Sequence, residues 1–152
     1  MRPMSLRRTA SLITALLLTV AACGKSESAE AKAKATVTGF FDDVAGGKGD
    51  AACSRLTGAA VRELSAAAFV MQAPASCPEA VKLVNDQISD DEKKALRSAT
   101  VNRVTIAGDK ATVNDDDIEL ELKGQTGLFR NNNPKPVELE KSGDDWKISS
   151  LG

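Results

Sequence analysis

Three cysteines are the residues of this 152-residue chain best suited to covalent chemistry. Cys23 stands alone near the start, whereas Cys53 and Cys77 lie further along. Thiols serve as lipid attachment points, disulfide partners, redox groups or metal ligands. The chain contains no histidine and no tyrosine, so two side chains that often move protons in enzymes are missing.

The segment before Cys23 has the layout of an export signal. Arg2, Arg7 and Arg8 form a positive start, and the apolar run SLITALLLTVAA follows. That run is shorter than the ~20 apolar residues needed to cross a bilayer. The motif VAAC that ends at Cys23 resembles the lipobox of bacterial lipoproteins. The resemblance implies removal of residues 1–22 as a signal peptide and attachment of diacylglycerol to Cys23.

The lipobox resemblance implies a lipid anchor. Such an anchor predicts a location on the extracytoplasmic face of the cell membrane. Two or three acyl chains, of which palmitate is typical, hold a protein there because each buried CH₂ contributes about 0.8 kcal/mol. The alternative is ordinary cleavage, which leaves a secreted protein with a free Cys23.

Charge excludes one class of partner. Removing the leader removes three arginines and no acid, so the net charge falls from −1 to −4. No basic stripe remains to bind nucleic acid. Residues 23–35, with the sequence CGKSESAEAKAKA, predict a lipidated N-terminus and a flexible tether, with a merger into the next helix through its alanines as an open alternative. Residues 36–152 then form one domain.

With Cys23 assigned to lipid, Cys53 and Cys77 form an even pair in an exported domain, where disulfides persist. We expect them to form a structural disulfide whose loop of about 24 residues contributes roughly 3–4 kcal/mol. A redox pair is disfavoured because the spacing is not C-x-x-C. A zinc site is disfavoured because no histidine accompanies the thiols. We expect no metal and no cofactor.

The first half of the mature chain shows the hydrophobic periodicity and capping residues of helices. Val37, Phe40, Phe41 and Val44 recur at the spacing of one helix face, and two glycines end that helix. Further helix starts are predicted at Asp50, Thr57, Pro78 and Ser89, the last with a capping box to Glu92.

After residue 99 the pattern changes to short alternating runs. Gly108-Asp109 predicts a hairpin, and Ile118, Leu120 and Leu122 alternate with charged residues. In the last two strands the inward positions are Val137, Leu139, Trp146 and Ile148. Helices followed by antiparallel strands predict an α+β fold with the helices on one sheet face.

The order of these elements carries a second resemblance. The stretch VTGFFDDVAGGKGDAACSRLTGAAVREL resembles the opening of NTF2-like domains, in particular small actinobacterial lipoproteins. VTIAGDKATV resembles a central strand pair of that family, and VELEKSGDDWKIS resembles its last hairpin. The resemblance implies a cone in which helices wrap a curved antiparallel sheet around an interior pocket. The family includes ketosteroid isomerases, polyketide cyclases and dehydratases, together with members that bind without catalysis. Because family members often pair through the sheet, we expect this chain to be a monomer or a homodimer.

Five apolar residues are candidates for lining the pocket or a partner surface, with core packing as the competing interpretation: Phe40, Phe69, Met71, Phe129 and Trp146. Asp42-Asp43 is interpreted as the polar side of a helix, with an isomerase-like base as the alternative. Asp115-Asp116-Asp117 is interpreted as a solvated turn, with a cation site as the alternative. No catalytic residue is assigned.

The sequence therefore predicts a non-catalytic binding or interaction module that engages an envelope protein or a small apolar ligand. The alternative is a SnoaL-like or ketosteroid-isomerase-like enzyme that uses an aspartate base in the cone pocket. A third hypothesis is an accessory lipoprotein whose cone is filled by side chains.

Overall fold

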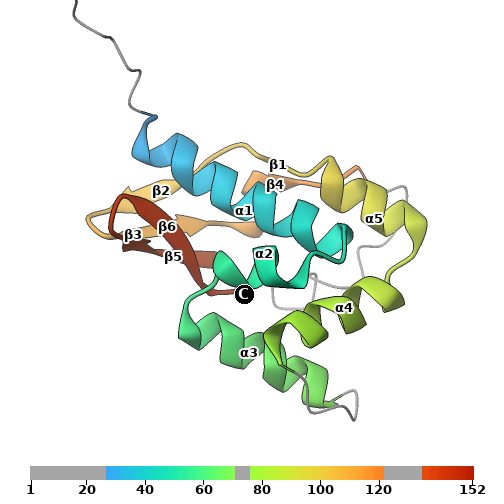
Figure 1. Ribbon diagram of the computed structural model, residues 1–152. Helices are drawn as coiled ribbons and strands as arrows, with labels where there is room; N and C mark the ends of the chain where they lie inside the picture. The colour runs from blue at the N-terminus through green and yellow to red at the C-terminus, as the bar shows by residue number, and fades with distance from the viewer. Residues whose placement is uncertain (1–26, 71–75, 122–134) are drawn as a thin grey trace, which may run out of the picture.

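A computed structural model describes residues 27–70, 76–121 and 135–152. Its helices are α1 (Ala29–Ala45), α2 (Gly49–Ser54), α3 (Gly58–Val70), α4 (Cys77–Gln87) and α5 (Asp90–Arg97). The strands, with one 3-10 turn, are β1 (Thr100–Val101), β2 (Thr105–Ala107), β3 (Lys110–Val113), η1 (Asp115–Asp117), β4 (Ile118–Glu119), β5 (Val137–Ser142) and β6 (Asp145–Ser150). The predicted α+β class and the order of helices before strands are confirmed (Figure 1).

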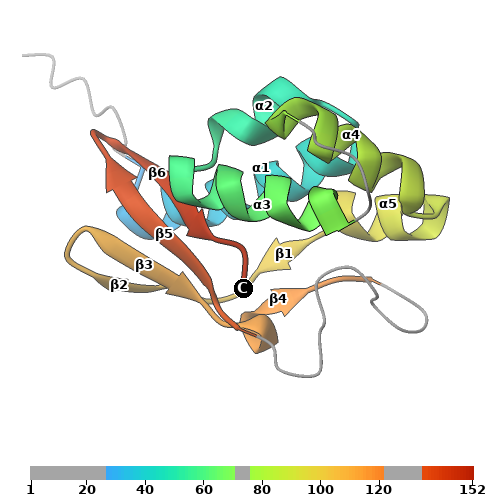
Figure 2. The same ribbon diagram turned by 90° about the horizontal axis from the view of Figure 1, so that it is seen from below.

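The strands form an antiparallel sheet in the order β2-β3-β5-β6, and β1 pairs with β4 beside it. The helices gather on one side of this sheet (Figure 2). On the other face Glu140 of β5 lies between Lys110 of β3 and Lys147 of β6 in the strand register. Opposite charges on neighbouring strands stabilise such a pairing. The inward positions carry the apolar residues predicted for them, and Leu139 and Ile148 are almost fully buried.

Helix α1 is the centre of the hydrophobic core. Val37, Phe40 and Val44 are buried on its inner face, which packs against β6 and α5. The helix ends at Gly46, as predicted. Its last carbonyl groups are not left without partners, because Asn85 donates to Val44 O (2.9 Å) and Arg97 donates to Ala45 O (3.0 Å).

The start of α1 corrects the predicted tether. The hydroxyl of Ser28 accepts a hydrogen bond from Ala31 N (3.1 Å), and the helix begins at Ala29. Ala33 is fully buried, so residues 29–35 belong to the folded domain. Alanine and lysine are strong helix formers, and the burial of Ala33 against the core stabilises these first turns of α1.

The cysteine pair ties α2 to α4. Cys53 and Cys77 lie at disulfide-bonding distance, with Cα atoms 6.1 Å apart, as the sequence predicted. The two helices approach closely because Gly49 has no side chain. A Cβ atom there would lie 2.7 Å from Pro78 Cα. The N-cap residue of α2 is Lys48, two residues before the predicted Asp50. Asp50 lies in the first turn instead, where its carboxylate interacts favourably with the helix dipole.

Capping boxes begin α4 and α5. Ser76 and Ser89 each donate a backbone hydrogen bond of 2.8 Å to the carboxylate three residues ahead, Glu79 and Glu92. These bonds, reinforced by the serine hydroxyl groups, hold the pKa of both carboxyl groups below the ordinary value. The charged form is thus favoured in the folded state, and this contribution to stability is lost as the pH falls through the lowered pKa.

Candidate functional site

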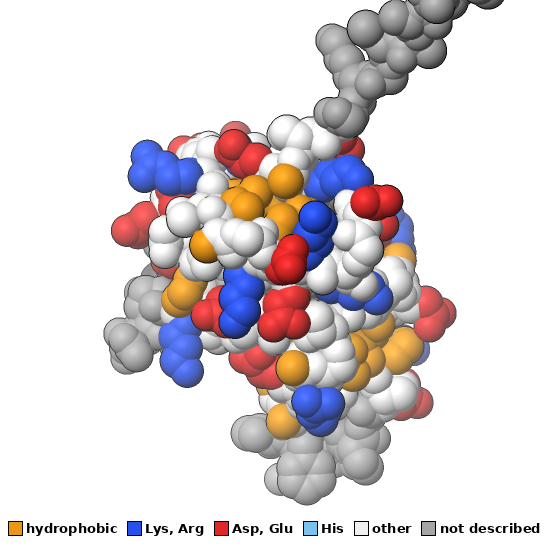
Figure 3. Space-filling view, turned by 90° about the vertical axis from the view of Figure 1, so that its left-hand side faces the viewer, with side chains coloured by type: hydrophobic (Ala, Val, Ile, Leu, Met, Phe, Trp, Pro, Cys, Tyr) orange, Lys and Arg blue, Asp and Glu red, His pale blue; other side chains and the backbone are white. Residues whose placement is uncertain are grey.

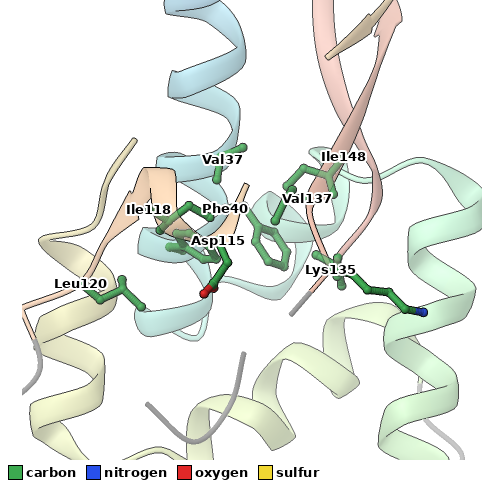
Figure 4. Close-up of a pocket in the computed structure, with 10 residues that line it drawn as sticks. Val37, Phe40, Asp115, Ile118, Leu120, Lys135, Val137 and Ile148 are labelled. Carbon is green, nitrogen blue, oxygen red and sulfur yellow. The ribbon is translucent and has the colours of Figure 1, made fainter. Parts of the chain in front are cut away.

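An apolar pocket lies between α1 and the strands, with a volume of about 40 Å³. Figure 4 shows Val37 and Phe40 of α1 on one side and Val137 and Ile148 of the sheet on another. Ile118 of β4 closes a third side. Leu120, Phe41 and Leu151 complete the apolar lining. The pocket is thus lined by residues of α1, of the β4 region and of strands β5 and β6.

Two charged residues border this apolar surface. Asp115 belongs to η1, the short turn between β3 and β4, and Lys135 precedes β5. Asp115 is half-buried, and its side chain is among those lining the pocket in Figure 4. The predicted solvated turn is therefore correct for the local structure, but it also brings one carboxylate to the pocket.

The structure separates the five predicted pocket residues. Phe40 is 1% exposed and lines the apolar pocket, so it serves the core and the pocket together. Trp146 is buried too, but it lines a different hollow beside the start of α1. Phe69 lies near the end of α3, and its side chain lies outside the described part of the structure, as do Met71, Phe129 and the predicted lipidation residue Cys23.

Asp43, considered as an isomerase-like base, is held in an ion-pair network. Its carboxylate is buried and accepts a hydrogen bond of 2.8 Å from Arg55 Nε. Lys48 Nζ lies 3.7 Å away, and its hydrogen bond to Asp42 (3.1 Å) raises the pKa of Lys48. The network joins α1 to α2 and lies outside the apolar pocket.

Gly39 makes room for this network. A Cβ atom at Gly39 would lie 2.5 Å from the guanidinium carbon of Arg55. The guanidinium therefore lies flat against the α1 backbone, one turn before Asp43. A glycine inside a helix ordinarily costs stability, and here it allows a buried carboxylate to meet its cation.

Most of the pocket lining was not singled out from the sequence. Alternation identified Ile118, Leu120, Val137 and Ile148 as half-buried strand positions, but alternation does not tell which of them meet around one pocket. The sequence singled out Asp115 as part of a turn or a cation site but not as a pocket residue, because its place beside residues of α1 arises from tertiary packing.

No helix within residues 27–70, 76–121 and 135–152 is long and apolar enough to span a membrane. In the same residues no cluster of three or more acidic, histidine or cysteine side chains is arranged to hold a metal ion. No protein-family model, curated protein or solved structure matches the chain.

Replacing Arg55 tests the ion-pair network. We expect Arg55→Leu to lower the free energy of unfolding by about 2 kcal/mol, because it removes the main partner of a buried carboxylate. Urea denaturation measures the change. The matched control is Lys48→Gln, which removes an exposed cation from the same carboxylate and has a smaller effect. Equal losses in the two variants would contradict the assignment of Arg55 as the main partner.

Proposed function

We propose that this protein is a lipid-anchored binding module on the extracytoplasmic face of the cell membrane. In the proposal Cys23 carries the anchor, and the helices and sheet form an NTF2-like cone. The pocket of that cone engages an apolar group of an envelope protein or a small apolar ligand. The observation that carries the binding role is the apolar pocket beneath α1, which two charged residues border.

The size of the pocket favours a small group. Sites for whole drug-sized ligands occupy about 300–1,000 Å³. The pocket of about 40 Å³ has room for one aliphatic group rather than for a steroid-sized molecule. An aliphatic side chain presented by a protein, or the end of a small apolar molecule, matches that volume and its apolar lining.

Two features support a role without catalysis. The chain has no histidine or tyrosine to act as a proton donor beside an aspartate. Asp43, the carboxylate on the helix that lines the pocket, is committed to Arg55 and Lys48. Its pairing gives it a structural role in joining α1 to α2.

One observation favours the enzymatic alternative. Asp115 borders the apolar pocket, and a carboxylate against an apolar surface is the arrangement that isomerase-type bases use. Under this alternative Asp115, rather than Asp43, is the base. Its test is Asp115→Asn, which abolishes turnover by such an enzyme, whereas a module that only binds shows no turnover before or after the change.

The anchor is tested by acyl labelling in cells. We expect the protein to incorporate an alkyne analogue of palmitate and to stay with the membrane fraction. Cys23→Ser removes both properties, because the thioether can no longer form. The control is the double variant Cys53→Ser/Cys77→Ser, which keeps the label. A Cys23→Ser protein that is still labelled would contradict the anchor.

The pocket is tested by site-specific photocrosslinking in native membranes. A photoreactive residue at Leu151, half-exposed at the pocket, is expected to form an adduct with one protein or one small molecule. The same residue at Ile106 is the control, because Ile106 is apolar and 37% exposed but belongs to β2, outside the pocket. Adding Ile118→Phe fills the pocket and removes the adduct. Identical products at Leu151 and Ile106 would contradict binding at the pocket.

A further inference from the structure

A second hollow of about 360 Å³ lies beside β6, between the first turns of α1 and the end of α2. Figure 3 looks onto the end of the molecule where α1 begins, and there basic and acidic side chains surround a small apolar patch. We call this hollow the polar groove. Its lining residues are Glu27, Lys32, Ala35, Thr36, Ser54, Arg55, Asp145, Trp146 and Lys147. Its volume lies in the range of sites that hold small molecules.

The groove is rich in hydrogen-bond donors. Arg55 uses Nε for Asp43, and within the described residues its two terminal nitrogens make no hydrogen bond. Lys147 likewise has no ion pair in the described part of the chain. The indole N–H of Trp146 has no protein acceptor there, and no buried side-chain nitrogen or oxygen of those residues lacks a partner, so that N–H is reachable from solvent. Donors from α2 and β6 therefore meet in one groove.

The acids of the groove are partly neutralised. Asp145 lies 4.0 Å from Lys32 Nζ, which also donates to the carbonyl of Asp144 (2.8 Å). Glu27 lies at the edge, two residues before α1. What remains for a ligand is the pair of terminal nitrogens of Arg55, whose Nε is bonded to Asp43, and Lys147 lines the same groove. A guanidinium fork and an ammonium match the oxygens of a phosphate group.

The length of the chain before α1 fixes where this groove lies. Four peptide units separate Cys23 from Glu27, and fully extended they reach about 14 Å. Glu27 itself lines the groove. If Cys23 is embedded through its acyl chains, the groove lies within that distance of the lipid headgroups, close to the range of about 8–10 Å over which charges act at physiological salt.

We propose that the polar groove binds the phosphate group of an anionic phospholipid in the membrane that holds Cys23. This inference rests on the proposed anchor, because the anchor supplies the closeness to lipid. A free phosphate ion shares the chemistry, so the experiment separates the two sources. Binding orients the domain with the start of α1 toward the bilayer and the apolar pocket away from the anchor.

Trp146 makes the test direct, because the chain has one tryptophan and no tyrosine. The acylated protein is reconstituted into vesicles of phosphatidylcholine, with increasing fractions of phosphatidylglycerol. We expect the emission of Trp146 to shift with phosphatidylglycerol and the shift to weaken at high salt. Lys147→Gln should require about five times the fraction of phosphatidylglycerol, because a lysine near an anionic surface contributes about 1 kcal/mol.

The matched control is Lys110→Gln. Lys110 and Lys147 both pair with Glu140 in the sheet register, but Lys110 lies outside the groove. The control keeps the wild-type response. A response that both variants lose equally would overturn the assignment to the groove.

The remaining outcomes separate the groove from the anchor. If the protein stays on the vesicles but the emission of Trp146 does not change with the fraction of phosphatidylglycerol, the groove proposal is overturned and the anchor is not. Protein that does not stay on the vesicles overturns the anchor, and with it lipid as the source of phosphate. An equal shift of the soluble full-length Cys23→Ser chain with inorganic phosphate overturns the lipid source in favour of a free phosphate site.

Discussion

The ion pair between Asp43 and Arg55 is the contact on which the arrangement of this domain depends. It joins the central helix α1 to α2 across Gly39. Arg55 and the residue after it also bond to the sheet: Ile148 N donates to the carbonyl of Arg55 (2.8 Å), and Leu56 forms a β-bridge with Ile148. Arg55 therefore contacts the buried carboxylate through its guanidinium and the edge of β6 through its backbone carbonyl. Removing Arg55 leaves the buried carboxylate of Asp43 without its main counter-charge.

That edge serves both hollows. Ile148 forms a wall of the apolar pocket, and Trp146, two residues earlier on the same strand, lines the polar groove. Helix α1 runs past both, with Lys32 near its start at the groove and Phe40 further along at the pocket. If Cys23 is anchored in the membrane, the position of each hollow along α1 limits its distance from the membrane, because an α-helix rises about 1.5 Å per residue.

Much of the framework was predictable because local rules dominate it. The apolar face of α1, the capping box at Ser89 and the hairpin at Gly108-Asp109 depend on neighbouring residues, and each appears in the structure. The cysteine pair was predictable once Cys23 was assigned to lipid. The residue at which α1 begins was not, because the alanines left a helix open as an alternative, and the burial of Ala33 is a tertiary effect that composition does not show.

The sites were less predictable than the fold. Phe40 and Trp146 were recognised as inward-facing, but hydrophobic patterning cannot tell that they belong to different hollows. Arg55 and Gly39 carried no signal as a pair, since neither residue type is unusual in its own segment. Asp115 reaches the pocket because η1 leads from β3 into β4, whose Ile118 lines the same pocket as Val37 and Phe40 of α1. These relations arise from packing between segments that lie far apart in the chain.

The most direct test of this account is the distance between Trp146 and the membrane. Energy transfer from Trp146 to a dansyl-labelled lipid headgroup measures it in vesicles that carry the acylated protein. The short link before α1 predicts a separation within about 25 Å, from the extended length of residues 23–27 and the rise of the first turns of α1. A separation beyond about 40 Å would contradict the account, because it requires residues 29–35 to act as an extended tether instead of as the first turns of α1.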